Sequence, residues 1–109
     1  MEQAVKESGA KRRAARAFIS AHEQEVIDLT CRLVAAPSPN LPGEETAPAR
    51  VMEEALAAFG LPAPVIVASA PHRPNLVVTI DTGRPGPKLG LCGHLDTKPV
   101  GEAAAEWRR

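Results

Sequence analysis

The first half of the chain carries apolar residues at the three- and four-residue spacing of amphipathic helices. Residues 11–36 predict one helix, which Pro37 ends, and residues 37–43 form a rigid polar loop rich in proline. Residues 44–59 predict a second helix, with acidic residues in its first turn and a stop at Gly60. The recurring positions of the first helix are Phe18, His22, Glu25/Val26, Leu29 and Leu33.

The second half carries short apolar runs bounded by turn residues. Residues 65–68, 75–80 and 88–93 predict three strands, and residues 81–87 predict a hairpin connection between the last two. Because the strand sequences are almost continuously apolar, the pattern favours an α/β protein whose sheet is covered on both faces. Two helices cannot cover both faces of such a sheet, so we expect an incomplete fold.

Composition narrows the class of protein. The hydrophobic fraction of 44% is ordinary for a globular chain, but aromatic residues make up only 3%, so a core must come from Ala, Val, Leu and Ile. The net charge of zero gives no general attraction to nucleic acid or to acidic membranes. No apolar run is long enough to span a bilayer and no secretory signal is evident, while Glu2 and Glu7 argue against a transit peptide. These features predict a cytoplasmic protein without nucleic-acid or membrane partners.

The stretch from Leu89 to Gly101 carries the candidate chemistry, since an apolar run ends there in His94-Leu-Asp96 and a Pro/Gly turn. Residues i and i+2 of an extended segment point to the same side, so both side chains can face one cavity. A neutral imidazole is a good zinc ligand, and a nearby carboxylate can orient it. Spacing alone leaves a second interpretation open, in which His94 ends a strand and Asp96 caps a turn.

Residues 26–107 resemble the N-terminal part of a zinc metallopeptidase/amidohydrolase family. Its members include acetylornithine deacetylase, succinyl-diaminopimelate desuccinylase, aminoacylase and glutamate carboxypeptidase. The resemblance covers about three quarters of the chain, and Trp107 looks like a tryptophan that precedes Asp-Pro-Phe in these enzymes. The matching motifs, in order, are Leu33-Val-Ala-Ala-Pro-Ser-Pro-Asn40, Pro42-Gly-Glu-Glu45, Asn75-Leu-Val-Val and Gly93-His-Leu-Asp-Thr-Lys-Pro-Val-Gly101.

The resemblance implies the N-terminal part of a zinc-exopeptidase-like catalytic domain, with two helices followed by three strands of a larger mixed sheet. His94 is then a ligand in a two-zinc site that cobalt could also fill, and Asp96 is the catalytic carboxylate that orients it. The implied reaction is metal-assisted hydrolysis of an amide bond in an N-acyl amino acid or small peptide. Lys98 departs from the family, where many relatives have an apolar residue. Residues 1–20 are expected to be an N-terminal extension and helix start, and residues 21–109 a partial catalytic domain.

In the resembled family the other metal ligands, the catalytic glutamate and a lid domain that serves dimerisation all lie further along the chain. We therefore expect an N-terminal fragment that is inactive alone and prone to aggregate through open strand edges. His22 and His72 match no ligand position and are expected to be surface or packing residues, and Asp81 a turn residue.

Other classes of function remain as alternatives. The basic residues within positions 11–16 could contact phosphates, but their small number and the lack of aromatic residues favour a solvated helix end. The chain could also be a non-catalytic remnant or a self-associating module. Cys31 and Cys92 form no C-x-x-C pattern, and Cys92 is expected to be an inert thiol inside a buried strand.

Overall fold

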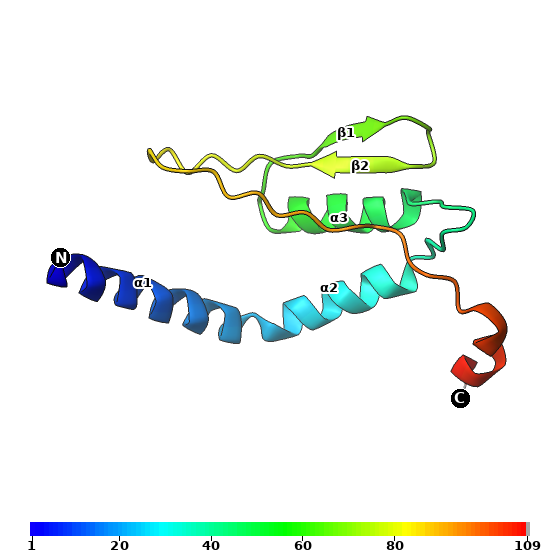
Figure 1. The fold of residues 1–109 in the computed structure, drawn as a ribbon, viewed down its shortest axis with the longest axis horizontal. Helices are drawn as coiled ribbons and strands as arrows, with labels where there is room; N and C mark the ends of the chain where they lie inside the picture. The colour runs from blue at the N-terminus through cyan, green and yellow to red at the C-terminus, as the bar shows by residue number, and fades with distance from the viewer. Residues whose placement is uncertain (109) are drawn as a thin grey trace. The chain divides into compact units, whose positions relative to one another are not determined.

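The computed structural model describes residues 1–108, except for the side chains of residues 2–5 and 107–108, so the Trp107 side chain lies outside the described residues. The chain divides into two compact units, Met1–Cys31 and Arg32–Arg109. Figure 1 shows the order of elements, three α-helices, a two-stranded sheet and a 3₁₀ helix. In coarse terms this confirms the predicted mixture of helix and sheet.

The first unit contains α1 (Glu2–Ala21) and most of α2 (Glu23–Ala35). The prediction of a single helix over residues 11–36 was wrong about its start and about its continuity. The helix begins nine residues earlier, and it is interrupted at His22. The His22 imidazole Nδ1 lies 2.7 Å from the carbonyl oxygen of Phe18, and its ring stacks on the Phe18 ring at 4.0 Å. Residues 2–10 lack an apolar stripe but include Ala, Glu, Gln and Lys, which favour helix without one.

In the second unit a loop leads to α3 (Thr46–Ala58), close to the predicted bounds. Pro48 is tolerated because the first turn of a helix has no internal partner for its amide groups. The helix ends as predicted at Gly60, whose φ of +67° is the left-handed conformation that glycine adopts without strain. The Leu61 amide donates to the Leu56 carbonyl at 2.9 Å, and the Gly60 amide donates to the Ala57 carbonyl at 3.0 Å. Two of the terminal carbonyl groups are thereby satisfied.

The sheet consists of β1 (Val65–Ala68) and β2 (Pro74–Val77), which pair antiparallel with Val65 opposite Val77. The first predicted strand is confirmed, whereas the second is shorter than residues 75–80. Helix α3 packs against β2 (Figure 1). The sheet is too small to be the predicted one covered on both faces.

The third predicted strand, residues 88–93, is not formed among the described residues, and neither is the hairpin expected over residues 81–87. Residues 88–96 have no regular secondary structure, and the chain next makes a parallel bridge between Thr97 and Pro39. Cys92 is therefore exposed, which corrects the expectation that it lies inside a buried strand. After the Pro/Gly turn, a 3₁₀ helix spans Gly101–Arg108.

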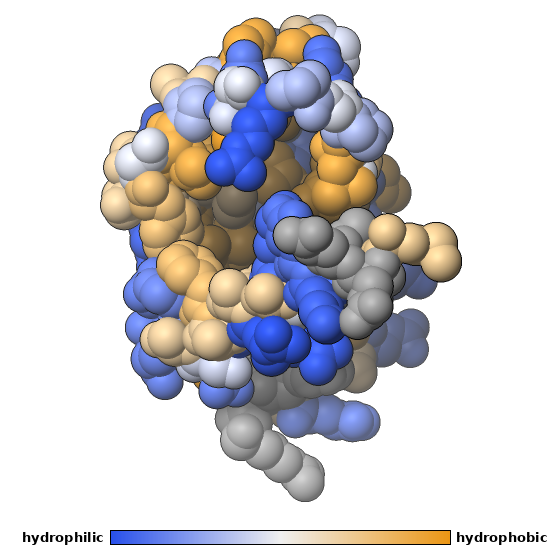
Figure 2. All heavy atoms as spheres, turned by 90° about the vertical axis from the view of Figure 1, so that its left-hand side faces the viewer, coloured by the Kyte–Doolittle hydropathy of each residue, from blue (hydrophilic) through white to orange (hydrophobic). Residues whose placement is uncertain are grey.

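The apolar core of the described residues is small. The buried apolar side chains include Ala36, Ala49 and Ala55. Exposed apolar side chains include Val65, Val67 and Val77 of the sheet and Leu89 and Leu91 of the following segment. Figure 2 shows hydrophobic side chains open on one face, intermixed with charged ones. No helix in the described part of the chain has the length and apolar character needed to cross a membrane.

Candidate functional site

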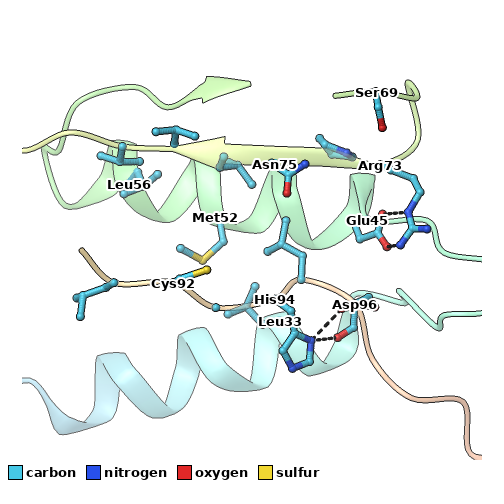
Figure 3. Close-up of a pocket in the computed structure, with 17 residues that line it drawn as sticks. Leu33, Glu45, Met52, Leu56, Ser69, Arg73, Asn75, Cys92, His94 and Asp96 are labelled. Atoms are coloured by element: carbon cyan, nitrogen blue, oxygen red, sulfur yellow. Dashed lines mark hydrogen bonds and ion pairs between the residues drawn. The ribbon is translucent and has the colours of Figure 1, made fainter. Parts of the chain in front are cut away.

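A cavity of about 890 Å³ lies within the second unit, between α3, β2 and the segment 91–96. In the close-up of Figure 3, Leu56, Met52 and Cys92 lie toward one end, and the charged groups gather toward the other. The site thus combines an apolar wall with a polar end. The polar and charged side chains that line it include Glu45, Ser69, Arg73, Asn75, His94 and Asp96.

His94 and Asp96 interact directly at the polar end of this cavity. The imidazole Nδ1 of His94 lies 2.9 Å from Oδ1 of Asp96 and 2.6 Å from the Asp96 backbone carbonyl oxygen. Both acceptors favour a proton on Nδ1, which leaves the Nε2 lone pair available. The His94 side chain is 83% exposed and the Asp96 side chain 29% exposed, so the imidazole is open to a ligand while the carboxylate is partly covered.

The loop that follows α2 holds the His94–Asp96 segment by its backbone. The Thr97 amide donates to the Ser38 carbonyl at 2.9 Å, and the Asn40 amide donates to the Thr97 carbonyl at 2.9 Å. The Ser38 hydroxyl, which is almost fully buried, donates to the Leu95 carbonyl at 2.8 Å. These three bonds fix where the His-x-Asp segment runs, because they satisfy its polar backbone groups on both sides of Asp96.

A second polar pair lies beside the first. The Arg73 guanidinium donates to both carboxylate oxygens of Glu45, at 3.0 and 3.2 Å, and the Glu45 side chain is only 7% exposed. The Glu45 amide also donates to the His72 carbonyl at 2.9 Å. Gly43 makes room for this pair, since a Cβ at that position would lie 2.8 Å from Arg73 Cζ and its φ is +83°. The start of α3 is thereby tied to the turn before β2.

The contacts of Asp96 shift the pKa values of both Asp96 and His94. The hydrogen bonds from the Asn40 amide and from His94 hold the pKa of the Asp96 carboxyl below its ordinary value. The backbone carbonyl of Asp96, followed by its carboxylate, raises the pKa of the His94 imidazole. His94 is therefore a stronger base than a free histidine.

We expect the substitution Asp96→Asn to lower the pKa of His94, because it removes the negative charge and leaves the carbonyl of residue 96 in place. An NMR titration of the ring protons measures this, with His22 as the internal reference. A His94 pKa that does not change would contradict the observed geometry.

The two pKa shifts determine how the stability of the folded chain depends on pH. The raised pKa of His94 gives stability that is lost as the pH rises through its folded value, and the lowered pKa of Asp96 gives stability that is lost as the pH falls through its folded value. Both contributions are complete between the ordinary pKa values of 3.8 and 6.5.

The residues present fit one part of a zinc site. A histidine whose Nδ1 faces a carboxylate and whose Nε2 is exposed has the arrangement of a zinc ligand with its supporting group. A catalytic zinc needs about three protein ligands. Within the described residues, no three His, Cys, Asp or Glu side chains come together to hold a metal. The arrangement can therefore supply one oriented ligand and no complete centre.

The structure separates the remaining candidates from this pair. His22 stacks on the exposed ring of Phe18, and neither His22 nor His72, both expected to be surface or packing residues, lines the cavity. Asp81 is the turn residue that was predicted, because its Oδ1 accepts a hydrogen bond from the Gly83 amide at 2.8 Å. Sequence reasoning overlooked Arg73. Arg73 comes just before a predicted strand, and Glu45 lies at the start of the predicted second helix. These two opposite charges were the available signal for the ion pair.

Sequence reasoning also gave no role to Asn40, whose amide reaches Asp96 across 56 positions of sequence. Comparison of the chain with models of known protein families, with curated proteins and with solved structures gives no match.

Proposed function

We propose that this chain forms the N-terminal part of the catalytic domain of a zinc-dependent hydrolase that cleaves amide bonds. His94 supplies one metal ligand, and Asp96 orients it. The sequence motifs around Pro42 and His94 that resemble the metallopeptidase/amidohydrolase family support the reaction class. The proposed parent protein is a cytoplasmic enzyme of the deacylase or carboxypeptidase type, and any homodimer it forms would use the lid domain, as is general in the resembled family.

One observation carries the proposal. The His94 imidazole is bonded through Nδ1 to Asp96, its side chain is 83% exposed, and both residues are among those that line the cavity. A histidine that only packs or caps a turn has no need of a carboxylate partner that is itself held by a third residue. Here the Asn40 amide holds that carboxylate at 2.8 Å. Such support is typical of a ligand whose orientation matters.

Bound zinc polarises the scissile carbonyl and lowers the pKa of a coordinated water. The residues of this chain position the imidazole through Nδ1 and raise its basicity, and the side chain remains 83% exposed. The remaining ligands belong to parts of the enzyme other than the described residues. Asp96 does not need to change its protonation state, since its lowered pKa keeps it ionised.

The substrate class follows from the resemblance and is compatible with the cavity. An N-acyl amino acid or a small peptide carries an amide bond between an apolar or small group and a carboxylate-bearing residue. The apolar wall formed with Met52 and Leu56 can receive the former, and the Arg73 guanidinium stands at the polar end. Arg73 is engaged by Glu45, so we assign it no contact with substrate.

A self-associating module is the second candidate function, and one observation favours it. Leu89 and Leu91 are 86% and 89% exposed on a segment without strand partners among the described residues. Such a segment can pair with another chain through both its backbone and its apolar side chains. A third alternative, a non-catalytic remnant, differs from the hydrolase in having no metal-dependent activity.

The test uses the complete protein that contains this segment, loaded with zinc and assayed on N-acetyl amino acids and dipeptides. We expect Asp96→Asn to lower activity by about 10- to 100-fold, as is usual when the group behind a metal ligand is changed. His94→Ala should lower it further, because a ligand is lost.

His72→Ala is the matched control, since His72 does not line the cavity and its hydrogen bond to the Glu45 amide is made by the backbone carbonyl. Metal-independent activity, or full activity of the His94→Ala variant, would refute the proposal.

A further inference from the structure

Asn40 connects two segments that are far apart in the sequence, the loop after α2 and the segment that carries Asp96. Its backbone amide is bonded to Thr97, and its side-chain Nδ2 donates to Oδ2 of Asp96 at 2.8 Å. The other carboxylate oxygen of Asp96, Oδ1, faces His94 Nδ1 at 2.9 Å. The three side chains thus form one continuous chain of hydrogen bonds from the loop to the imidazole.

We infer that Asn40 is a positioning residue, which selects the side-chain rotamer of Asp96 that presents Oδ1 to His94. Asp96 has two equivalent carboxylate oxygens, and its side chain can adopt several χ1 rotamers when it is not held. The amide of Asn40 can only donate through Nδ2, so it engages one oxygen and leaves the other directed at His94. The effect on metal binding rests on the proposed function, whereas the positioning itself does not.

The backbone around Asn40 allows the side chain to act without deforming the loop. Thr97 is bonded to Ser38 and to Asn40 through main-chain atoms, and the Ser38 hydroxyl adds a bond to Leu95. A change of the Asn40 side chain leaves all of these contacts in place. The loop therefore holds the amide at a fixed point, from which it can restrain a carboxylate that is only partly covered.

The experiment measures the dipolar coupling between Asp96 Cγ and His94 Nδ1 by solid-state NMR, which works for associated and monomeric chains alike. The 109-residue chain carries ¹³C at aspartate Cγ and ¹⁵N in the histidine rings. Among the described residues, the His–Asp ion pair is that of His94 and Asp96. The Asp96→Asn variant assigns the signal.

Asn40→Ala should remove most of this coupling, because the Asp96 side chain is then free to rotate about its Cα–Cβ bond, which carries Cγ away from His94 Nδ1. Asn40→Asp should remove it as well, since an anionic acceptor replaces the donor and repels Asp96. Ser38→Ala is the matched control. It breaks a bond between the same two segments without touching the Asp96 side chain, so the coupling should be retained.

The inference is overturned if both Asn40 variants keep the coupling, or if Ser38→Ala loses as much of it as Asn40→Ala does. If the variants do not fold, the unsubstituted chain tests the same point through an NMR contact between the Asn40 side-chain amide and Asp96 Cβ. The absence of this contact also overturns the inference. None of these results depends on zinc. A chain that shows the coupling but binds no metal retains Asn40 as a positioning residue and loses the proposed function.

Discussion

Replacing Leu89 and Leu91 together by glutamate is expected to convert a self-associating chain into a monomer. In the isolated chain these two leucines are almost fully exposed, at 86% and 89%, on a segment that has no strand partner among the described residues. Burial of one leucine contributes about 1.5–3 kcal/mol. Loss of both should therefore raise the dissociation constant at least about a hundredfold, and two like charges oppose strand pairing further.

Sedimentation velocity over a range of micromolar concentrations measures the effect. Leu41→Glu is the matched control, because Leu41 is 81% exposed but belongs to the proline-rich loop and not to this segment or the sheet. It should leave association unchanged. An unsubstituted chain that stays monomeric and unfolds cooperatively and reversibly would contradict the interpretation that its sheet is incomplete.

Arg73→Ala is expected to loosen the start of α3, because it leaves the Glu45 carboxylate buried without its partner. Removing one member of a buried ion pair costs far more than the pair itself contributes, since the remaining charge has lost its solvent. Arg73 is partly exposed, so water replaces some of the lost contact. We expect hydrogen-exchange protection of the Glu45 and Ala49 amides to fall by about ten- to thirtyfold.

Arg32→Ala is the control for this effect. The Arg32–Glu54 distance of 2.6 Å is shorter than those of the Arg73–Glu45 pair, but both of its side chains are largely exposed. Exposed ion pairs contribute little, so protection in α3 should change by no more than about twofold. Equal losses in the two variants would show that burial of Glu45 has no part in holding this helix.

The sequence predicted those elements whose signals are local. Helix α3 combined an apolar stripe with a glycine stop, and the left-handed Gly60 with its two backbone bonds shows why that stop is effective. The strand at residues 65–68 was likewise evident from a short apolar run between turn residues. In both cases a few neighbouring residues determine the backbone conformation.

The strand at residues 88–93 was not formed, because a strand depends on a partner and apolar sequence alone does not provide one. The same limit applies to the site. The His94–Asp96 contact follows from the spacing of two residues, so it could be anticipated. The Asn40–Asp96 and Arg73–Glu45 contacts join segments 56 and 28 positions apart and depend on how the chain folds back.

The zinc content of the complete protein that contains this segment shows whether His94 is a metal ligand. We expect about two zinc ions per chain for the unsubstituted protein, as in the resembled family, and a clear loss of zinc on His94→Ala, with no loss on His72→Ala. Zinc content that is the same in all three proteins, or absent from the unsubstituted one, would contradict the assignment of His94 as a metal ligand.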